Sequence, residues 1–74
     1  MNNERRKIIS AQIAIIEEAL SQLQEVFADE DEAFANMPES LQQSERGEAM
    51  AEGMVGIENA INSLENALED LGNL

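Results

Sequence analysis

The acidic run Asp29-Glu30-Asp31-Glu32 is the densest group of side chains that could bind a ligand. Clustered carboxylate oxygens suit Ca²⁺, but a calcium-binding loop also needs a glycine at its sixth position and a bidentate glutamate at its twelfth. Neither is present in the chain at that spacing. We therefore interpret the run as a solvated, charged cap near a turn.

Four glutamates could supply carboxylates to a di-metal site inside a helical bundle: Glu17, Glu18, Glu58 and Glu65. Such sites combine glutamates with Glu-x-x-His pairs that point into the bundle. The chain contains no histidine, and these glutamates flank the apolar positions rather than occupy them. We expect them to be solvating residues, with no metal site.

Catalysis is not expected either. The absence of both cysteine and histidine removes the thiolate and imidazole zinc ligands and the usual general base. The serine, asparagine and glutamine side chains then have no base to activate a nucleophile. The sequence therefore predicts no catalytic residue, no cofactor and no enzymatic activity.

The charge of the chain is strongly acidic, with a net charge of -12. Its bases are Arg5, Arg6 and Lys7 near the start and Arg46 farther on. This balance repels phosphate backbones and anionic lipids and favours basic proteins or cations. No apolar run approaches the length of a membrane span. The basic start and the isoleucines after it faintly resemble a signal peptide, but Ser10 and Gln12 interrupt the apolar run, so a secreted protein is not expected. We expect an intracellular protein that binds neither nucleic acid nor membrane directly.

Apolar residues recur at alternating spacings of four and three in both halves of the chain, which is the a/d pattern of packed helices. They are Ile9, Ile13, Ile16, Leu20, Leu23 and Phe27, then Met50, Met54, Ile57, Ile61, Leu64, Leu68 and Leu71. The pattern predicts one helix over about 4–34 and another over about 45–71. Pro38 interrupts helical geometry and predicts a turn or short helix over about 36–43.

An antiparallel hairpin aligns these two patterns without adjustment. Ile9 then lies opposite Leu71, Phe27 opposite Met54, and Phe34 opposite Gly47. We predict an all-α fold: one coiled-coil-like helical hairpin domain over residues 1–74, with its turn near residue 40. The basic run should then meet Glu69 and Asp70 at the open end.

A second row of residues lies beside this pattern. In the second helix the row consists of small residues. In the first helix the row is more apolar than a solvent-exposed face should be. We predict that the row of one chain packs on that of another to form a dimeric four-helix bundle. The alternative is that alanine and glycine merely fill a surface. The predicted oligomer interface is Ile8, Ile15, Ala19, Ala49, Gly53, Gly56, Ala60 and Ala67.

The segment MPESLQQSERGE, residues 37–48, resembles the segment joining two coiled-coil-like halves in a group of small acidic helical proteins encoded by phages and prophages. The resemblance implies a phage-linked accessory protein in the cytoplasm of a bacterial host, without an activity that can be carried over. Phe34, Ser44, Glu45 and Arg46 are the candidate partner-binding residues in and beside the segment. The alternative for this segment is a capped helix start with Arg46 held by a nearby acid.

Three functions are compatible with these observations. The first is a non-enzymatic protein-interaction module, a homodimer that also binds an unidentified target, as a phage-encoded inhibitor of a host defence or regulatory protein would. The second is an acidic DNA mimic that occupies the nucleic-acid site of a DNA-binding protein. The third is a purely structural assembly role. Met50 and Met54 could form an adaptable binding surface, although their a/d spacing favours core packing.

Overall fold

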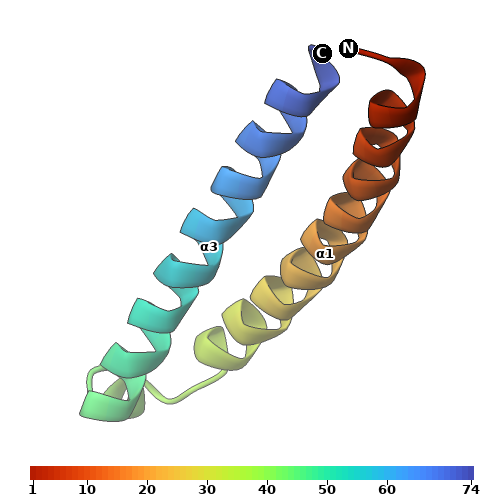
Figure 1. The fold of residues 1–74 in the computed structure, drawn as a ribbon. Helices are drawn as coiled ribbons and strands as arrows, with labels where there is room; N and C mark the ends of the chain where they lie inside the picture. The colour runs from red at the N-terminus through yellow and green to blue at the C-terminus, as the bar shows by residue number, and fades with distance from the viewer.

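The protein folds as a helical hairpin in a computed structural model that describes residues 1–74 (Figure 1). Its elements are α1 (Asn3–Ala35), the short helix α2 (Glu39–Gln42) and α3 (Glu45–Gly72). The two long helices run antiparallel and bring both termini to the end opposite the turn. This arrangement confirms the all-α antiparallel hairpin, and each long helix begins and ends within one residue of its expected position.

Local chemistry explains where the helices begin and end. The Asn2 side chain accepts a hydrogen bond from the Arg5 backbone N–H at 2.9 Å, which caps α1. Pro38 has a φ of -55° and a ψ of 144°, so the chain is extended there before α2 begins. Ser44 caps α3, because its hydroxyl accepts from the Gly47 N–H at 3.3 Å. These caps separate one long periodic pattern into three helices.

The apolar a/d residues of both long helices form a half-buried seam between α1 and α3. Glu30 occupies a seam position and is half-buried as well. Gly47 is the single buried residue of the chain, and no hydrophobic side chain is buried. The hairpin therefore has a contact line between two helices and lacks an enclosed core.

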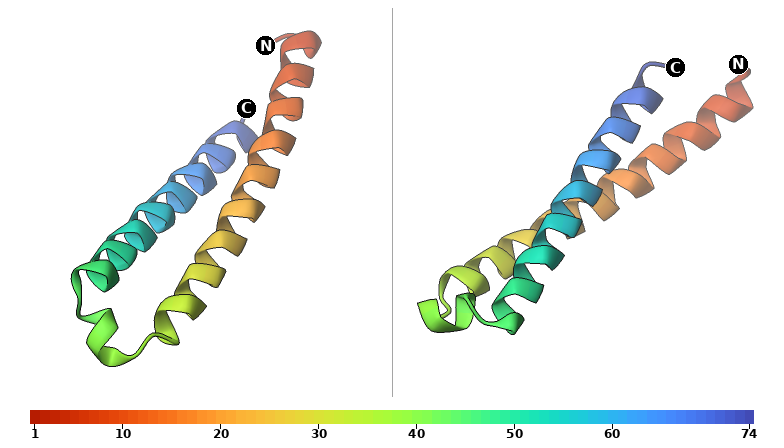
Figure 2. Two further views of the ribbon diagram at one scale, coloured as in Figure 1. Left: turned by 90° about the horizontal axis from the view of Figure 1, so that it is seen from below. Right: turned by 90° about the vertical axis from the view of Figure 1, so that its left-hand side faces the viewer.

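The molecule exposes more surface than its mass requires. Its extents are 58 × 14 × 14 Å and its radius of gyration is 17.0 Å, whereas a compact domain of this length has a radius of gyration of about 11 Å. Its accessible surface is 5592 Å², against about 4,500 Å² for a typical monomer of this mass. No third long element covers either flank (Figure 2). About 1,000 Å² of accessible surface is thus in excess of what a globular monomer would show.

The turn is held by side chains that bond to backbone. The Gln42 Nε2 atom donates to the carbonyl oxygens of Phe34 at 2.9 Å and Met37 at 3.1 Å. The Ser44 hydroxyl donates to the Leu41 carbonyl. A Cβ atom on Gly47 would overlap the carbonyl oxygens of Leu41 and Gln42. Gly47 was predicted to lie opposite Phe34, and in the structure its missing Cβ makes room for the end of α2.

Neither α1 nor α3 contains a stretch that is both long and apolar enough to cross a bilayer.

Candidate interaction surfaces

One flank of the hairpin carries no charge over most of its length. In an antiparallel helix pair, the positions that flank the seam on one helix lie on the same side as the equivalent positions of the other helix. The two predicted rows are equivalent in this sense, so the hairpin places them side by side. We call this surface the uncharged face: Ile8, Gln12, Ile15, Ala19, Gln22 and Val26 of α1, with Ala49, Gly53, Gly56, Ala60, Ser63 and Ala67 of α3.

The uncharged face is open to solvent. Ile8 and Ile15 are each 61% exposed and Val26 is 46% exposed. A Cβ atom added at Gly53 or Gly56 would meet no other atom within 4 Å. All of the predicted oligomer-interface residues lie on this face, and Ala67 is the only one of them that is half-buried. The hairpin brings these residues together and leaves them uncovered.

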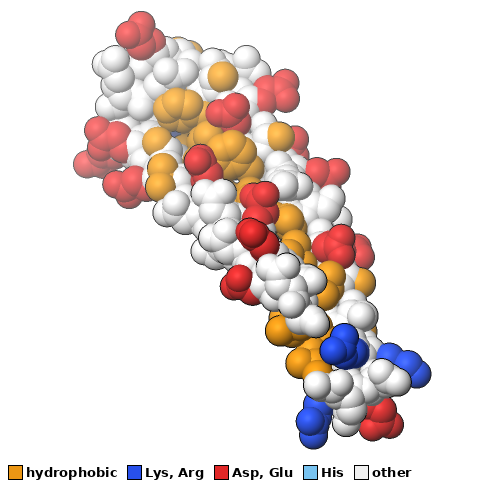
Figure 3. Space-filling model, turned by 90° about the horizontal axis from the view of Figure 1, so that it is seen from above, with side chains coloured by type: hydrophobic (Ala, Val, Ile, Leu, Met, Phe, Trp, Pro, Cys, Tyr) orange, Lys and Arg blue, Asp and Glu red, His pale blue; other side chains and the backbone are white.

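The opposite flank is polar and acidic. At the equivalent positions it carries Glu17 of α1 and Glu58, Glu65 and Glu69 of α3, all exposed. The space-filling view shows hydrophobic side chains in a band along the molecule, acids beside it, and basic side chains gathered at one end (Figure 3). In a chain with sixteen acidic residues, an uncharged face of this length is a marked asymmetry.

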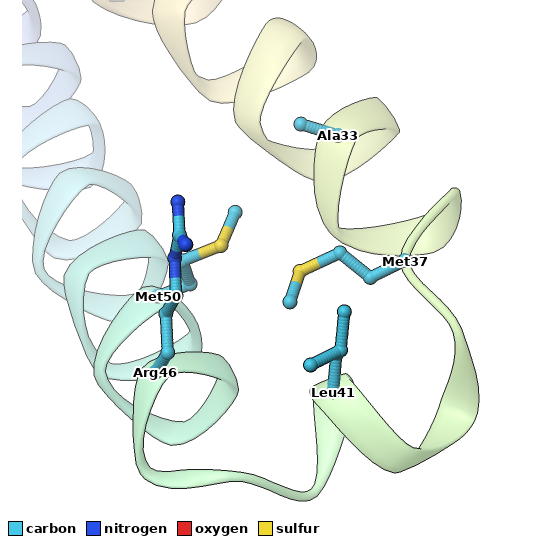
Figure 4. Close-up of a pocket in the computed structure, with 5 residues that line it drawn as sticks. All are labelled: Ala33, Met37, Leu41, Arg46 and Met50. Atoms are coloured by element: carbon cyan, nitrogen blue, oxygen red, sulfur yellow. The ribbon is translucent and has the colours of Figure 1, made fainter.

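A hollow of about 310 Å³ opens where the two long helices meet the turn. It is lined by Ala33, Met37, Leu41, Arg46 and Met50. The side chains of Met37, Leu41 and Met50 converge on it from the link between α1 and α2, from α2 and from α3, and the Arg46 side chain extends beside Met50 (Figure 4). The hollow therefore offers apolar walls and one guanidinium group, which suits an apolar side chain accompanied by a carboxylate.

The predicted partner-binding residues are divided by the structure. Arg46 lines the hollow, and Glu45 is exposed beside it. Phe34 is half-buried in the seam, and the Ser44 hydroxyl is engaged by the Leu41 carbonyl and the Gly47 N–H. Ser44 therefore acts as a helix cap.

Three residues of the hollow, Ala33, Met37 and Leu41, were not predicted from the sequence. Leu41 is 48% exposed and lies between polar residues of α2. A lone leucine in a turn segment with polar neighbours was the signal available in the sequence. Met37 continues the spacing of three and four beyond Phe27, through Glu30 and Phe34, but its part in a hollow depends on the direction that the chain takes after it.

The open end has a second, more polar hollow of about 290 Å³. Ile9, Ile13 and Leu71 form its base, together with Met1, Arg6, Ser10, Gly72 and Leu74. The Arg6 Nε atom donates to the Met1 carbonyl oxygen at 3.5 Å, and no side-chain hydrogen bond joins the basic run to Glu69 or Asp70. The expected pairing across the open end is absent from the hairpin.

The acidic run, residues 29–32, lies within the last turns of α1. Glu30 is the half-buried member of the run, and the other three acids are exposed. No group of three or more acidic residues converges in an arrangement that could hold a metal ion.

Comparison of the chain with protein-family models, curated proteins and solved structures finds no match.

Proposed function

We propose that this protein is a non-enzymatic protein-interaction module, a helical hairpin that works as a homodimer and binds a further protein. The observation that carries the proposal is the lack of an enclosed core: Gly47 is the only buried residue, and the surface exceeds that of a typical monomer of this mass by about 1,000 Å². Small domains with so little interior usually complete it by association. A dimeric four-helix bundle would supply that interior.

The hollow beside the turn supports a second contact, with the target. Its apolar lining and Arg46 fit a partner segment that presents a leucine or methionine next to an acid. In the phage context that residues 37–48 imply, the target would be a host defence or regulatory protein. This proposal assigns Arg46 to binding and Ser44 to the fold.

The test is affinity capture from a bacterial lysate with three baits: the wild type, Leu41→Glu and Ser40→Glu. Both substitutions add one acid to α2, but only Leu41 lines the hollow. We expect a protein to be captured by the wild type and by Ser40→Glu and to be lost with Leu41→Glu. Capture that is equal for the two variants would contradict a role of the hollow, and no specific capture by any bait would favour a structural assembly role.

A DNA mimic is the second candidate, and the elongated acidic shape favours it. The hairpin is 58 Å long and carries a net charge of -12, so a dimer would carry twice that charge over a similar length. Duplex DNA presents one charge per about 1.7 Å, which is of the same order. Binding by mimicry should weaken steeply as salt rises and should compete with duplex DNA for the same protein. Salt-insensitive binding without such competition would exclude it.

A further inference from the structure

We propose that the uncharged face docks a second copy of this chain with both turns at the same end, so that α1 of each copy lies over α3 of the other. The inference rests on the proposed homodimer and specifies its face and its orientation.

The flank that carries the uncharged face has enough area for a stable interface. At the length and width of the hairpin, 58 by 14 Å, the whole flank covers about 800 Å², which is the area that each partner contributes to a standard-size interface. The excess of about 1,000 Å² of exposed surface is of the same size. The uncharged face is the part of this flank from Ile8 to Val26, about 27 Å long at 1.5 Å per residue. The apolar groups that would form the centre of such an interface are already exposed, with Ile8 and Ile15 each 61% exposed.

The absence of charge on this face identifies its occupant. The proteins that acids attract are basic, and those would dock on the glutamate-bearing flank. A surface with no charge from Ile8 to Val26 and from Ala49 to Ala67 requires a partner that is itself uncharged over that length. The same face of a second copy meets this requirement.

Symmetry leaves two ways to stack the face on itself. A two-fold axis along the hairpin keeps the turns together and sets α1 over α3, whereas an axis across the hairpin places the turns at opposite ends and sets each helix over its own equivalent. The first pairs the isoleucines and valine of α1 with the small residues of α3. The second faces large side chains with large ones and small residues with small ones.

The register of the hairpin supports the first arrangement. Ile9 and Leu71 lie together at the open end, so Ile15 is level with Glu65 and Val26 is level with Val55. An axis along the hairpin preserves these levels. Ile15 then enters the space between Ser63 and Ala67 of the partner subunit, and Val26 enters that between Gly53 and Gly56 of the partner subunit. Each large side chain meets a space left by small ones.

The second arrangement would leave unfilled space. Ile15 and Val26 would hold the two α1 helices apart, while Gly53 and Gly56 would face other small residues in α3. Groups that line such voids lose their dispersion contacts. Packing therefore favours turns at the same end.

Charge opposes this orientation and provides a test of it. Residues 29–48 contain seven acids and one base, Arg46, so two turn ends placed together repel each other. This repulsion is screened beyond about 8 Å at physiological ionic strength. We therefore expect self-association to tighten as salt is added, whereas opposed turns would bring bases near acids and weaken with salt.

Sedimentation equilibrium tests the face. The wild type should show twice the chain mass of 8.2 kDa, and Gly56→Leu should raise the dimer dissociation constant about tenfold or more. Leucine favours helix over glycine, so a loss of dimer with retained helicity cannot come from unfolding. The matched control is Asn62→Leu on the opposite flank, which should leave the dissociation constant unchanged.

A spin label tests the orientation. The chain has no cysteine, so Ser40→Cys creates a single labelling site in α2. The distance between labels in the dimer should be well under the 58 Å length of the hairpin. A distance close to that length would overturn the proposed orientation.

These measurements distinguish a failure of the proposed homodimer from a failure of the proposed face. A monomeric wild type at tens of micromolar would overturn both the homodimer and its face. A dimer that Gly56→Leu and Asn62→Leu leave equally intact would overturn the face alone.

Discussion

The side-chain amide of Gln42 donates from Nε2 to the carbonyl oxygen of Phe34 at 2.9 Å, so the short helix α2 caps the end of α1. The same nitrogen donates to the Met37 carbonyl at 3.1 Å. The last carbonyl groups of a helix have no partner within the helix and must find one elsewhere. The Phe34 carbonyl also accepts from the Met37 N–H at 3.1 Å. One glutamine thus bonds two backbone carbonyl groups and holds the turn against α1.

Substitution of Gln42 by glutamate should destabilise the hairpin. The change keeps the shape of the side chain but removes both donors, and each lost hydrogen bond costs about 1 kcal/mol. We expect the free energy of unfolding in urea to fall by about 1–3 kcal/mol. Gln43→Glu is the control, because Gln43 makes only a 3.4 Å contact to Glu39 on the surface. Equal losses would show that added charge, rather than capping, is responsible.

Alanine should have opposite effects at two glycines. At Gly47 the new Cβ would overlap the Leu41 and Gln42 carbonyl oxygens, and relieving that overlap should cost about 1–3 kcal/mol of stability. At Gly53 the Cβ would meet no atom of the same chain, so the higher helix propensity of alanine should add about 0.5–1 kcal/mol to the monomer, measured at concentrations below the dimer dissociation constant. Circular dichroism during thermal unfolding measures both. A stabilised Gly47→Ala would contradict the tight turn.

Leucine at Glu30 should stabilise the hairpin. Glu30 is half-buried at a seam position, where a carboxylate gains little and an apolar side chain would contact α3. We expect a gain of about 1 kcal/mol in the free energy of unfolding. Glu32→Leu removes the same charge from an exposed position of α1 and should change stability by less than about 0.5 kcal/mol. Similar gains from both would indicate relief of acidic repulsion instead of seam packing.

Alanine at Ser44 should weaken the start of α3. The Ser44 hydroxyl joins the Leu41 carbonyl to the Gly47 N–H, and loss of a serine cap costs about 1 kcal/mol. Ser40→Ala is a suitable comparison, since Ser40 is exposed in α2 and makes no side-chain hydrogen bond. Hydrogen exchange at the first amides of α3 should quicken only in Ser44→Ala. Unchanged exchange there would place the cap elsewhere.

The amino-acid sequence was sufficient to determine the helices and the seam. The spacing of four and three from Ile9 to Phe27 and from Met50 to Leu71 is a local property, because it repeats within a few helical turns. Pro38 and Ser44 act on their immediate neighbours, so the separation into three helices could be predicted as well. The two rows that flank the seam were also visible.

The tertiary structure decided the remainder. That the rows share one exposed face follows only once the helices pair antiparallel, because parallel pairing would place them on opposite sides. The hollow of Met37, Leu41 and Met50, the bonds of Gln42 and the contact at Gly47 depend on the path of a short turn. No periodic pattern encodes that path, since it results from backbone groups of three segments finding partners in one another.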